Sequence, residues 1–278
     1  MTGLSTVAYV FDPYVAPITL SSFTQVSNPT TDLFCSGHSA LPDGRLLVEG
    51  GGFYPNQFLP PQAANRFDPA ASTWTLIAPM NSRRWYPTST TLPDGRVLAF
   101  SGIKENTPVP PAAEEPIAEF YAPDQNTWVP APASAQSYQP LYPYMFVLPD
   151  GNVFDSGHYG FQTRVLNLLS WTWGSNMTRP YDAGGDDGSA VMYGVGKIRK
   201  CGGYGPAVNK TLFIDFGAGT PTAWTGNSPT NDMQKARRNF NLTILPNGRV
   251  LATGGNTVGS TGGNAWYDAE QFNPATNT

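Results

Sequence analysis

The heptapeptide LPDGRLL, which begins at Leu41, returns along the chain with little change. The further copies are LPDGRVL from Leu92, LPDGNVF from Leu148 and LPNGRVL from Leu245, and GVGKIRKCGG from Gly194 is a degenerate copy between the last two. The Asp-Gly or Asn-Gly pair of each clear copy is typical of a two-residue hairpin turn, which needs residues that tolerate positive φ. Short runs of β-branched and apolar residues flank these pairs, so the copies predict β-hairpins.

The spacing of the hairpins indicates the architecture. Their turn glycines lie 51, 56 and 97 residues apart, and the last interval corresponds to two shorter periods. A repeat of about 50 residues is typical of kelch-type β-propellers, in which each repeat forms one blade. Glycines also follow the second strand of each hairpin, where they allow strands to crowd around a central channel. We therefore predict an all-β fold with a single β-propeller domain over residues 1–278 and repeats near 32–74, 83–128, 138–173, 186–224 and 237–278.

A second phrase closes the repeats. RFDPAASTW ends at Trp74 and FYAPDQNTW at Trp128, and both tryptophans are expected in the core. A third copy, QFNPATNT, stops at Thr278, one residue before the expected tryptophan. A propeller leaves strand edges unpaired unless its ring closes. We therefore expect about five blades of a larger ring that is truncated at its C-terminus, and a complete five-bladed ring is the alternative.

Composition agrees with a turn-rich β protein and argues against several classes of function. Glycine and proline make up about a fifth of the 278 residues, and charged residues only 13%. The net charge of −4 does not fit a nucleic-acid-binding surface, which is basic. No apolar run approaches the ~18 residues of a membrane-spanning helix, and no signal peptide is visible. The histidines, His38 and His158, are too few and too far apart to predict a zinc site.

Two phrases place chemically distinctive residues just before the innermost strand of a blade. DLFCSGHSALPDG contains Cys35, and RRWYPTSTTLPDGRV contains Tyr86, which lies 51 residues further along the chain. Equivalent positions of adjacent blades meet around the axis of a propeller. We therefore expect Cys35 and Tyr86 to be neighbours at one end of the channel.

These phrases, together with the LPDG hairpins and LYPYMFVLPDG from Leu141, resemble the galactose oxidase and glyoxal oxidase family of copper radical oxidases. RWYP and LYP are closer to the glyoxal oxidase branch. The resemblance implies a seven-bladed kelch-type propeller. It also implies that a thioether joins Cys35 to the ring of Tyr86, that Tyr86 binds copper, and that the linked pair is a protein-derived radical cofactor. The sulfur substituent makes the phenol easier to oxidise, and copper supplies the second electron of the reaction.

The resemblance also implies an activity and the location of the missing ligands. The family oxidises small aldehydes or primary alcohols with O2 and produces H2O2, and a secreted or extracellular protein is implied. Its other copper ligands are a tyrosine followed directly by histidine, and a second histidine. Tyr-His occurs nowhere in this sequence, so we expect these ligands beyond Thr278, in further C-terminal blades. Pro143 follows Leu141-Tyr142 where galactose oxidases carry a substrate-binding arginine, which argues against galactose as the substrate.

Other interpretations stay open on the sequence alone. Cys35 could be a buried structural thiol, as Cys201 is expected to be, and Tyr86 a core aromatic residue. Trp85 is a further candidate for the cofactor site, although packing would explain it equally well. The protein could instead be a non-catalytic kelch-repeat binding module for a protein or glycan, or a pseudo-enzyme that has the pair but no metal. Arg84 could line the channel mouth, and packing or a surface ion pair would explain it equally well. The acidic pair at 114–115 lies in a proline-rich stretch, so we expect it in a loop on the solvated surface.

Overall fold

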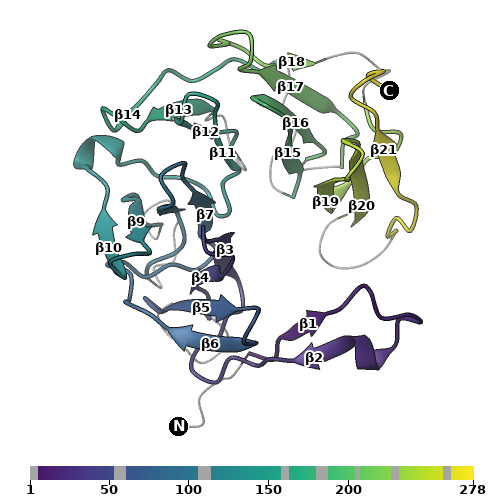
Figure 1. Cartoon of the computed structure of the whole chain (residues 1–278). Helices are drawn as coiled ribbons and strands as arrows, with labels where there is room; N and C mark the ends of the chain where they lie inside the picture. Colours follow the sequence, from purple (N-terminus) through teal and green to yellow (C-terminus); the bar gives the residue numbers. More distant parts are fainter. Residues whose placement is uncertain are drawn as a thin grey trace. The chain divides into compact units, whose positions relative to one another are not determined.

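The chain folds into antiparallel sheets that follow one another along the sequence (Figure 1). The structure is a computed structural model that describes residues 6–52, 61–105, 114–157, 163–179, 187–203, 207–226, 232–258 and 264–278. Within these ranges the helices are two single-turn 3-10 helices, η1 (Leu20–Ser22) and η2 (Ala133–Ala135). None of the helices in the described ranges has the length and apolarity needed to cross a membrane. The predicted all-β fold is confirmed, since five consecutive sheets form the blades of a β-propeller.

The first of two compact units covers Met1–Tyr142. It contains a hairpin of β1 (Tyr9–Phe11) and β2 (Phe23–Gln25), followed by two four-stranded blades. Consecutive strands pair antiparallel in both blades. Blade A consists of β3 (Ser36–Ala40), β4 (Leu46–Gly50), β5 (Ala64–Asp68) and β6 (Thr73–Leu76), and blade B of β7 (Thr88–Thr91), β8 (Val97–Phe100), β9 (Glu119–Ala122) and β10 (Thr127–Pro130).

The second unit, Pro143–Thr278, contains the other three blades. Their described strands are again antiparallel and paired in sequence order. Blade C consists of β11 (Met145–Val147), β12 (Val153–Asp155), β13 (Arg164–Asn167) and β14 (Thr172–Trp173). Blade D consists of β15 (Ser189–Gly194), β16 (Lys197–Cys201), β17 (Thr211–Asp215) and β18 (Thr225–Gly226), and blade E of β19 (Arg238–Ile244), β20 (Val250–Asn256) and β21 (Glu270–Phe272).

The LPDG phrase forms the first hairpin of its blade, as predicted, but the loop has three residues instead of two. In blade A the amide of Gly44 donates to the carbonyl of Leu41 (3.0 Å), and the amide of Leu41 donates to the carbonyl of Arg45 (2.8 Å). Gly44 has a φ of 85°, whereas neither Pro42 nor Asp43 has a positive φ. The loop is therefore a type I turn followed by a glycine bulge. The same backbone bonds recur at the copies that begin at Leu92, Leu148 and Leu245.

The aspartate of the phrase has its own function in this turn. The Asp43 carboxylate accepts the backbone amide of Arg45 (3.0 Å), which lies two residues further along the chain. Asp and Asn favour such local bonds because their short side chains reach the backbone two residues on. The degenerate copy in blade D lacks the phrase but still forms a hairpin, in which Gly194 pairs with Lys197.

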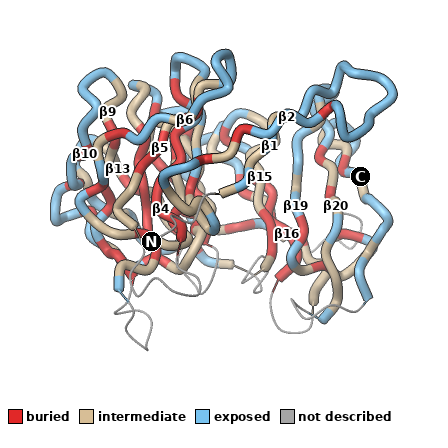
Figure 2. Tube along the Cα trace, turned by 90° about the horizontal axis from the view of Figure 1, so that it is seen from below, coloured by how far each residue is buried: buried red, intermediate tan, exposed pale blue. Residues whose placement is uncertain are grey.

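The buried residues of each unit lie mainly along its strands, as Figure 2 shows. The tryptophan that closes blade B is 8% exposed and packs on Tyr121, with ring centroids 5.2 Å apart. The indole of Trp128 donates to the carbonyl of Ala78 (2.9 Å). Trp74 is half-buried, and its indole donates in the same way to the carbonyl of Val26. Each of these side chains therefore ties the outer strand of a blade to the segment that enters it.

The expectation for the acidic pair at 114–115 is wrong. Glu114 and Glu115 are 8% and 4% exposed. Glu114 lies in a β-bridge with Ile103, and the Glu115 carboxylate accepts the amide of Ile117 (2.9 Å) and lies 3.9 Å from the Lys104 ammonium. Burial raises the pKa of Glu114 to about 7. The backbone at Glu114 pairs with Ile103 and thereby rejoins blade B. This pairing buries two side chains that the composition of the segment assigned to an exposed loop.

Candidate active site

The two residues that the sequence singled out occupy the same place in successive blades. Cys35 lies directly before β3 and Tyr86 two residues before β7. Both have a left-handed backbone, with φ of 61° and 63°. Tyr142, 56 residues after Tyr86, shares this conformation (φ 49°), as do Asp187 (66°) and Asn239 (55°) in the second unit. Few non-glycine residues adopt this region, so the left-handed residue is a repeated feature of the fold.

Backbone hydrogen bonds join these positions from one blade to the next. The amide of Tyr86 donates to the carbonyl of Cys35 (3.0 Å), and the amide of Tyr142 donates to the carbonyl of Tyr86 (3.0 Å). Asn239 and Asp187 make the same bond in the second unit (2.6 Å). Cys35 and Tyr86 are therefore neighbours, as their spacing predicts.

Aromatic side chains surround the Cys35 thiol. The Cys35 thiol lies close to the side chains of Tyr86 and Tyr142, and both neighbours lower its pKa. The rings of Trp85 and Tyr86 are stacked, with centroids 3.9 Å apart, and the rings of Tyr86 and Tyr142 lie 4.7 Å apart at 46°. All four residues are half-buried, so the cluster borders solvent. Cys35 forms no disulfide, and Cys201 is the fully buried thiol that was expected.

The surroundings keep the cluster protonated. Burial raises the pKa of Tyr86 to about 12, and the hydrogen bond with Cys35 acts in the same direction. Burial also raises the pKa of Tyr142, with a further rise from Cys35 and Tyr86. Burial raises the pKa of Cys35, although the hydrogen bond with Tyr86 opposes that shift. At neutral pH the two phenols and the thiol are therefore uncharged.

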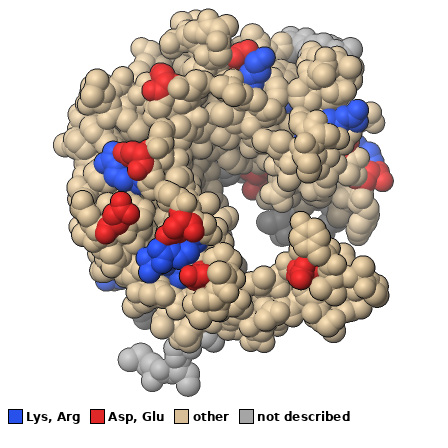
Figure 3. All heavy atoms as spheres, in the orientation of Figure 1, with Lys and Arg blue, Asp and Glu red and all other residues tan. Residues whose placement is uncertain are grey.

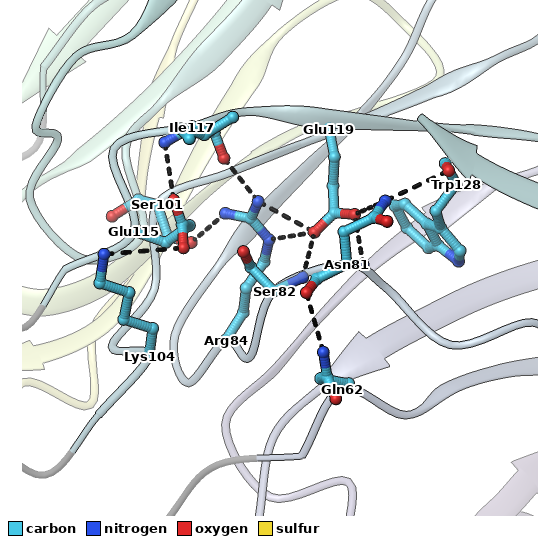
Figure 4. A network of polar contacts seen from close by, with 10 residues as sticks. All are labelled: Gln62, Asn81, Ser82, Arg84, Ser101, Lys104, Glu115, Ile117, Glu119 and Trp128. Carbon is cyan, nitrogen blue, oxygen red and sulfur yellow. Dashed lines mark hydrogen bonds and ion pairs between the residues drawn. The ribbon is translucent and has the colours of Figure 1, made fainter. Parts of the chain in front are cut away.

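A buried ion pair holds the segment that carries Tyr86 (Figure 4). Arg84 is fully buried, and its Nε and Nη2 donate to one oxygen of Glu119 at 3.2 and 3.1 Å. Nη1 donates to the carbonyl of Ser101 (2.7 Å) and Nη2 to that of Ile117 (2.7 Å). The expectation that Arg84 lines the channel mouth or forms a surface ion pair is therefore wrong. We call these contacts the Arg84 network.

The acid of the Arg84 network is also fully engaged. The oxygens of Glu119 accept the backbone amides of Asn81 (2.7 Å) and Ser82 (3.2 Å), and the side-chain amide of Asn81 (2.9 Å). A buried charge is tolerated only when it is paired and hydrogen-bonded. The network meets this requirement with acceptors and donors from several elements of blade B.

Blade A packs closely against the backbone of Arg84. The amide of Gly51 donates to the Arg84 carbonyl (3.1 Å). A Cβ on Gly50 would lie 2.2 Å from that carbonyl oxygen, and a Cβ on Gly102 would lie 2.9 Å from the Arg84 Cβ. Trp85 and Ile103 exchange backbone hydrogen bonds of 3.0 and 2.8 Å. The approach to Tyr86 is thus fixed from both blades.

A second buried carboxyl lies between the strands that follow Cys35 and Tyr86. Glu49 of β4 is fully buried, and its Oε1 accepts a hydrogen bond from Ser89 of β7. A Cβ on Gly37 would lie 2.7 Å from the same oxygen. The other oxygen of Glu49 has no partner among the described residues. Burial raises the pKa of Glu49 to about 8, with Arg84 opposing and Glu119 adding to the rise.

Charged side chains on the surface form local pairs of opposite sign. On the face shown in Figure 3, basic and acidic groups lie next to one another and no patch of one sign gathers. Two of the pairs lie within the LPDG turns, where Arg45 contacts Asp43 and Arg96 lies 2.6 Å from Asp94. Exposed pairs of this kind contribute little to stability.

Few groups in the described part of the chain could bind a metal. There, no cluster of three or more His, Cys, Asp and Glu side chains is found. His38 is exposed on β3, and His158 lies outside the described residues.

Comparison with known proteins supports the family resemblance. No family model matches the chain. The chain is 27% identical to a putative aldehyde oxidase, Art an 7, of Artemisia annua, over 87% of this chain and 45% of that protein. It is 28% identical to aldehyde oxidase GLOX of Vitis pseudoreticulata (84% and 46%) and 26% identical to galactose oxidase of Gibberella zeae (82% and 35%). The resemblance to the galactose oxidase and glyoxal oxidase family is confirmed. The chain spans about half or less of the length of these relatives.

A solved structure has the same fold. It is described as a fungal alcohol oxidase of the AA5 family in complex with copper, and it superposes with a TM-score of 0.69 at 22% identity. The match covers 90% of this chain and 53% of that one. At this identity the likeness shows the fold, in agreement with the propeller blades.

Proposed function

We propose that this chain forms the Cys35–Tyr86 part of a copper radical oxidase, which oxidises a small aldehyde or primary alcohol with O2 and forms H2O2. The observation that carries this proposal is the contact between Cys35 and Tyr86, which lie 51 residues apart in sequence and are joined by a backbone hydrogen bond of 3.0 Å. That contact occurs in a chain whose relatives are named aldehyde oxidase and galactose oxidase.

The proposed cofactor is a thioether between Cys35 and Tyr86. The new bond joins the sulfur to the ring carbon next to the hydroxyl, and it replaces the S–H and one ring C–H bond. Two electrons and two protons leave the pair, and O2 takes them up. The backbone hydrogen bond from the Tyr86 amide to the Cys35 carbonyl (3.0 Å) supports this assignment, because it makes the two residues neighbours.

Tyr86 would also bind the metal. When bound, copper supplies one-electron redox chemistry next to the phenol. The Tyr86 pKa of about 12 keeps its proton in place at neutral pH, and a cation at the oxygen would favour the phenolate. The remaining ligands would be supplied by other residues of the intact protein.

The aromatic neighbours would protect and border the cofactor. The Trp85 ring, stacked 3.9 Å from that of Tyr86, would limit the access of water to the proposed radical. Tyr142 borders the pair on the chain that continues into Pro143, where galactose oxidases carry an arginine. A small substrate without the hydroxyl array of galactose fits this difference.

Intact-mass spectrometry tests the proposal. Copper(II) and air are added to the intact, metal-free protein, and we expect the mass to fall by two hydrogen atoms. Cys35→Ser should show no change, whereas Cys201→Ser should lose the two hydrogens as the wild type does. Peptide mapping should place the link between Cys35 and Tyr86. An unchanged mass in folded, copper-loaded protein would contradict the proposal and leave a non-catalytic propeller that binds a protein or glycan.

A further inference from the structure

The Arg84 network has a counterpart in the second unit. Arg237 is fully buried, and its Nε donates to Glu270 (3.0 Å), Nη1 to the carbonyl of Gly254 (2.5 Å) and Nη2 to that of Asp268 (2.7 Å). Glu270 in turn accepts the backbone amides of two residues that precede Arg237. We call these contacts the Arg237 network. It repeats the arginine-to-carboxylate bond, the two bonds from the guanidinium to backbone carbonyls and the two backbone amides that the acid accepts.

Each network ends at the same structural position. Arg84 lies two residues before Tyr86, and Arg237 lies two residues before Asn239. Tyr86 and Asn239 are both left-handed, and each donates its amide to the equivalent residue of the preceding blade. The networks thus fix the approach to a left-handed residue in both units, but only in the first unit does that residue face a thiol.

We propose that Arg84 is a positioning residue, which with Glu119 holds the Trp85–Tyr86 segment so that the Tyr86 ring lies against the Cys35 sulfur. The inference rests on the proposed function, because that function assigns Tyr86 to the crosslink with Cys35. The Arg237 network does the same for a position without this chemistry, and it therefore serves as an internal control.

Arginine suits this task because its planar guanidinium presents several donors in a fixed fork. In the Arg84 network the fork reaches a carbonyl after β8, a carbonyl before β9 and the Glu119 carboxylate on β9. The position of Arg84 is therefore defined against two strands of blade B at once. A lysine would keep the charge but could not satisfy these acceptors together.

Each network has a cysteine that reports on it. The amide of Tyr86 donates to the carbonyl of Cys35 (3.0 Å), so release of the Tyr86 segment would uncover Cys35. Cys201 is fully buried in a cluster with Met233 and Phe240, which lie on either side of Arg237 in the sequence. Release of the Arg237 segment would therefore uncover Cys201.

The test compares Arg84→Lys with Arg237→Lys in the metal-free chain. The alkylation rates of Cys35 and Cys201 are measured with iodoacetamide under native conditions and resolved by peptide mass spectrometry. We expect Arg84→Lys to raise the Cys35 rate by about threefold or more, through local opening, and to leave the Cys201 rate unchanged. Arg237→Lys should raise the Cys201 rate and leave the Cys35 rate at the wild-type value.

Two results in folded protein would overturn the proposal. One is an unchanged Cys35 rate in folded Arg84→Lys protein. The other is an equal rise of both rates in either variant, which would indicate a loss of global stability. If Arg84→Lys does not fold, the double variant Arg84→Met/Glu119→Met removes both charges, and Arg237→Met/Glu270→Met is its match. Should neither Arg84 variant fold, the network is needed for folding itself and the positioning role is wrong.

A second measurement separates this inference from the proposed function. Intact protein is treated with copper(II) and air, and the fraction that has lost two hydrogens is measured. This fraction should be smaller in Arg84→Lys than in the wild type, and it should be the same in Arg237→Lys as in the wild type. If the wild type gives none, the proposed function fails, and the alkylation rates still decide whether Arg84 positions Tyr86.

Discussion

Glu49 stores a proton inside the first unit. It is fully buried, one of its oxygens has no partner among the described residues, and its pKa is raised to about 8 from an ordinary value of 4.5. Between pH 4.5 and about pH 8, Glu49 is therefore protonated in the folded protein and ionised in the unfolded chain. Stability contributed by this proton is fully present below pH 4.5 and is lost as the pH rises through about 8.

We therefore expect Glu49→Gln to flatten the dependence of stability on pH. In the wild type this group lowers the free energy of unfolding by up to about 1.4 kcal/mol per pH unit across the window. Urea unfolding at several values between pH 5 and pH 8 measures the slope. Glu114, with a pKa of about 7, adds a slope of the same sign, so some dependence should stay in the variant. Parallel curves for the two proteins would show that Glu49 is ionised in the folded state.

Tyr142 affects the reactivity of the thiol through its hydroxyl. Its hydroxyl lowers the pKa of the Cys35 thiol, so Tyr142→Phe should raise that pKa further. The pH profile of Cys35 alkylation in metal-free protein measures the shift. Tyr14→Phe, at an exposed tyrosine, should leave the profile unchanged. A profile for Tyr142→Phe identical to that of the wild type would contradict this effect of the hydroxyl.

Glycine is required in the hairpins for two different reasons, a left-handed backbone and close contact with a neighbouring segment. Gly44 and Gly50 both have positive φ, but a Cβ on Gly44 would meet nothing within 4 Å, whereas one on Gly50 would lie 2.2 Å from the Arg84 carbonyl oxygen. Gly44→Ala should therefore cost about 1–2 kcal/mol, the price of the left-handed backbone alone. Gly50→Ala should cost clearly more, because a backbone atom must move as well. Urea unfolding of the two variants tests this order. Equal losses of unfolding free energy would mean that the contact between Gly50 and the Arg84 carbonyl can open without cost.

The regular parts of these elements could be predicted from the sequence, and their polar interior could not. The LPDG phrase predicts each hairpin because proline, aspartate and glycine have strong local preferences. The three-residue loop was missed because Asp-Gly is compatible with both loop lengths. The Arg84 network was missed because charged residues usually lie at the surface, and because Arg84 and its partner Glu119 are 35 residues apart in sequence. Its recurrence at Arg237 and Glu270, 153 and 151 residues further on, was the available signal.

For the whole molecule, the period near 50 residues predicted the propeller blades, and the two phrases around Cys35 and Tyr86 predicted the family. Tyr142 was not singled out, although it stands one repeat beyond Tyr86. The remaining copper ligands, the substrate and secretion are not accessible from the residues described, because the chain spans about half or less of its relatives. These points stay predictions.

The left-handed residue at the start of each inner strand is a position where the blades can carry different chemical groups. Cys35, Tyr86, Tyr142, Asp187 and Asn239 include a thiol, two phenols, a carboxylate and an amide, yet the same left-handed backbone holds them. The position therefore accommodates side chains of different chemistry, and at Asp187 the side chain also pairs with Arg238 and accepts from Asn239. Transplanting a cysteine and a tyrosine to Asp187 and Asn239 would place a thiol beside a phenol in the second unit, a starting point for engineering an artificial crosslink.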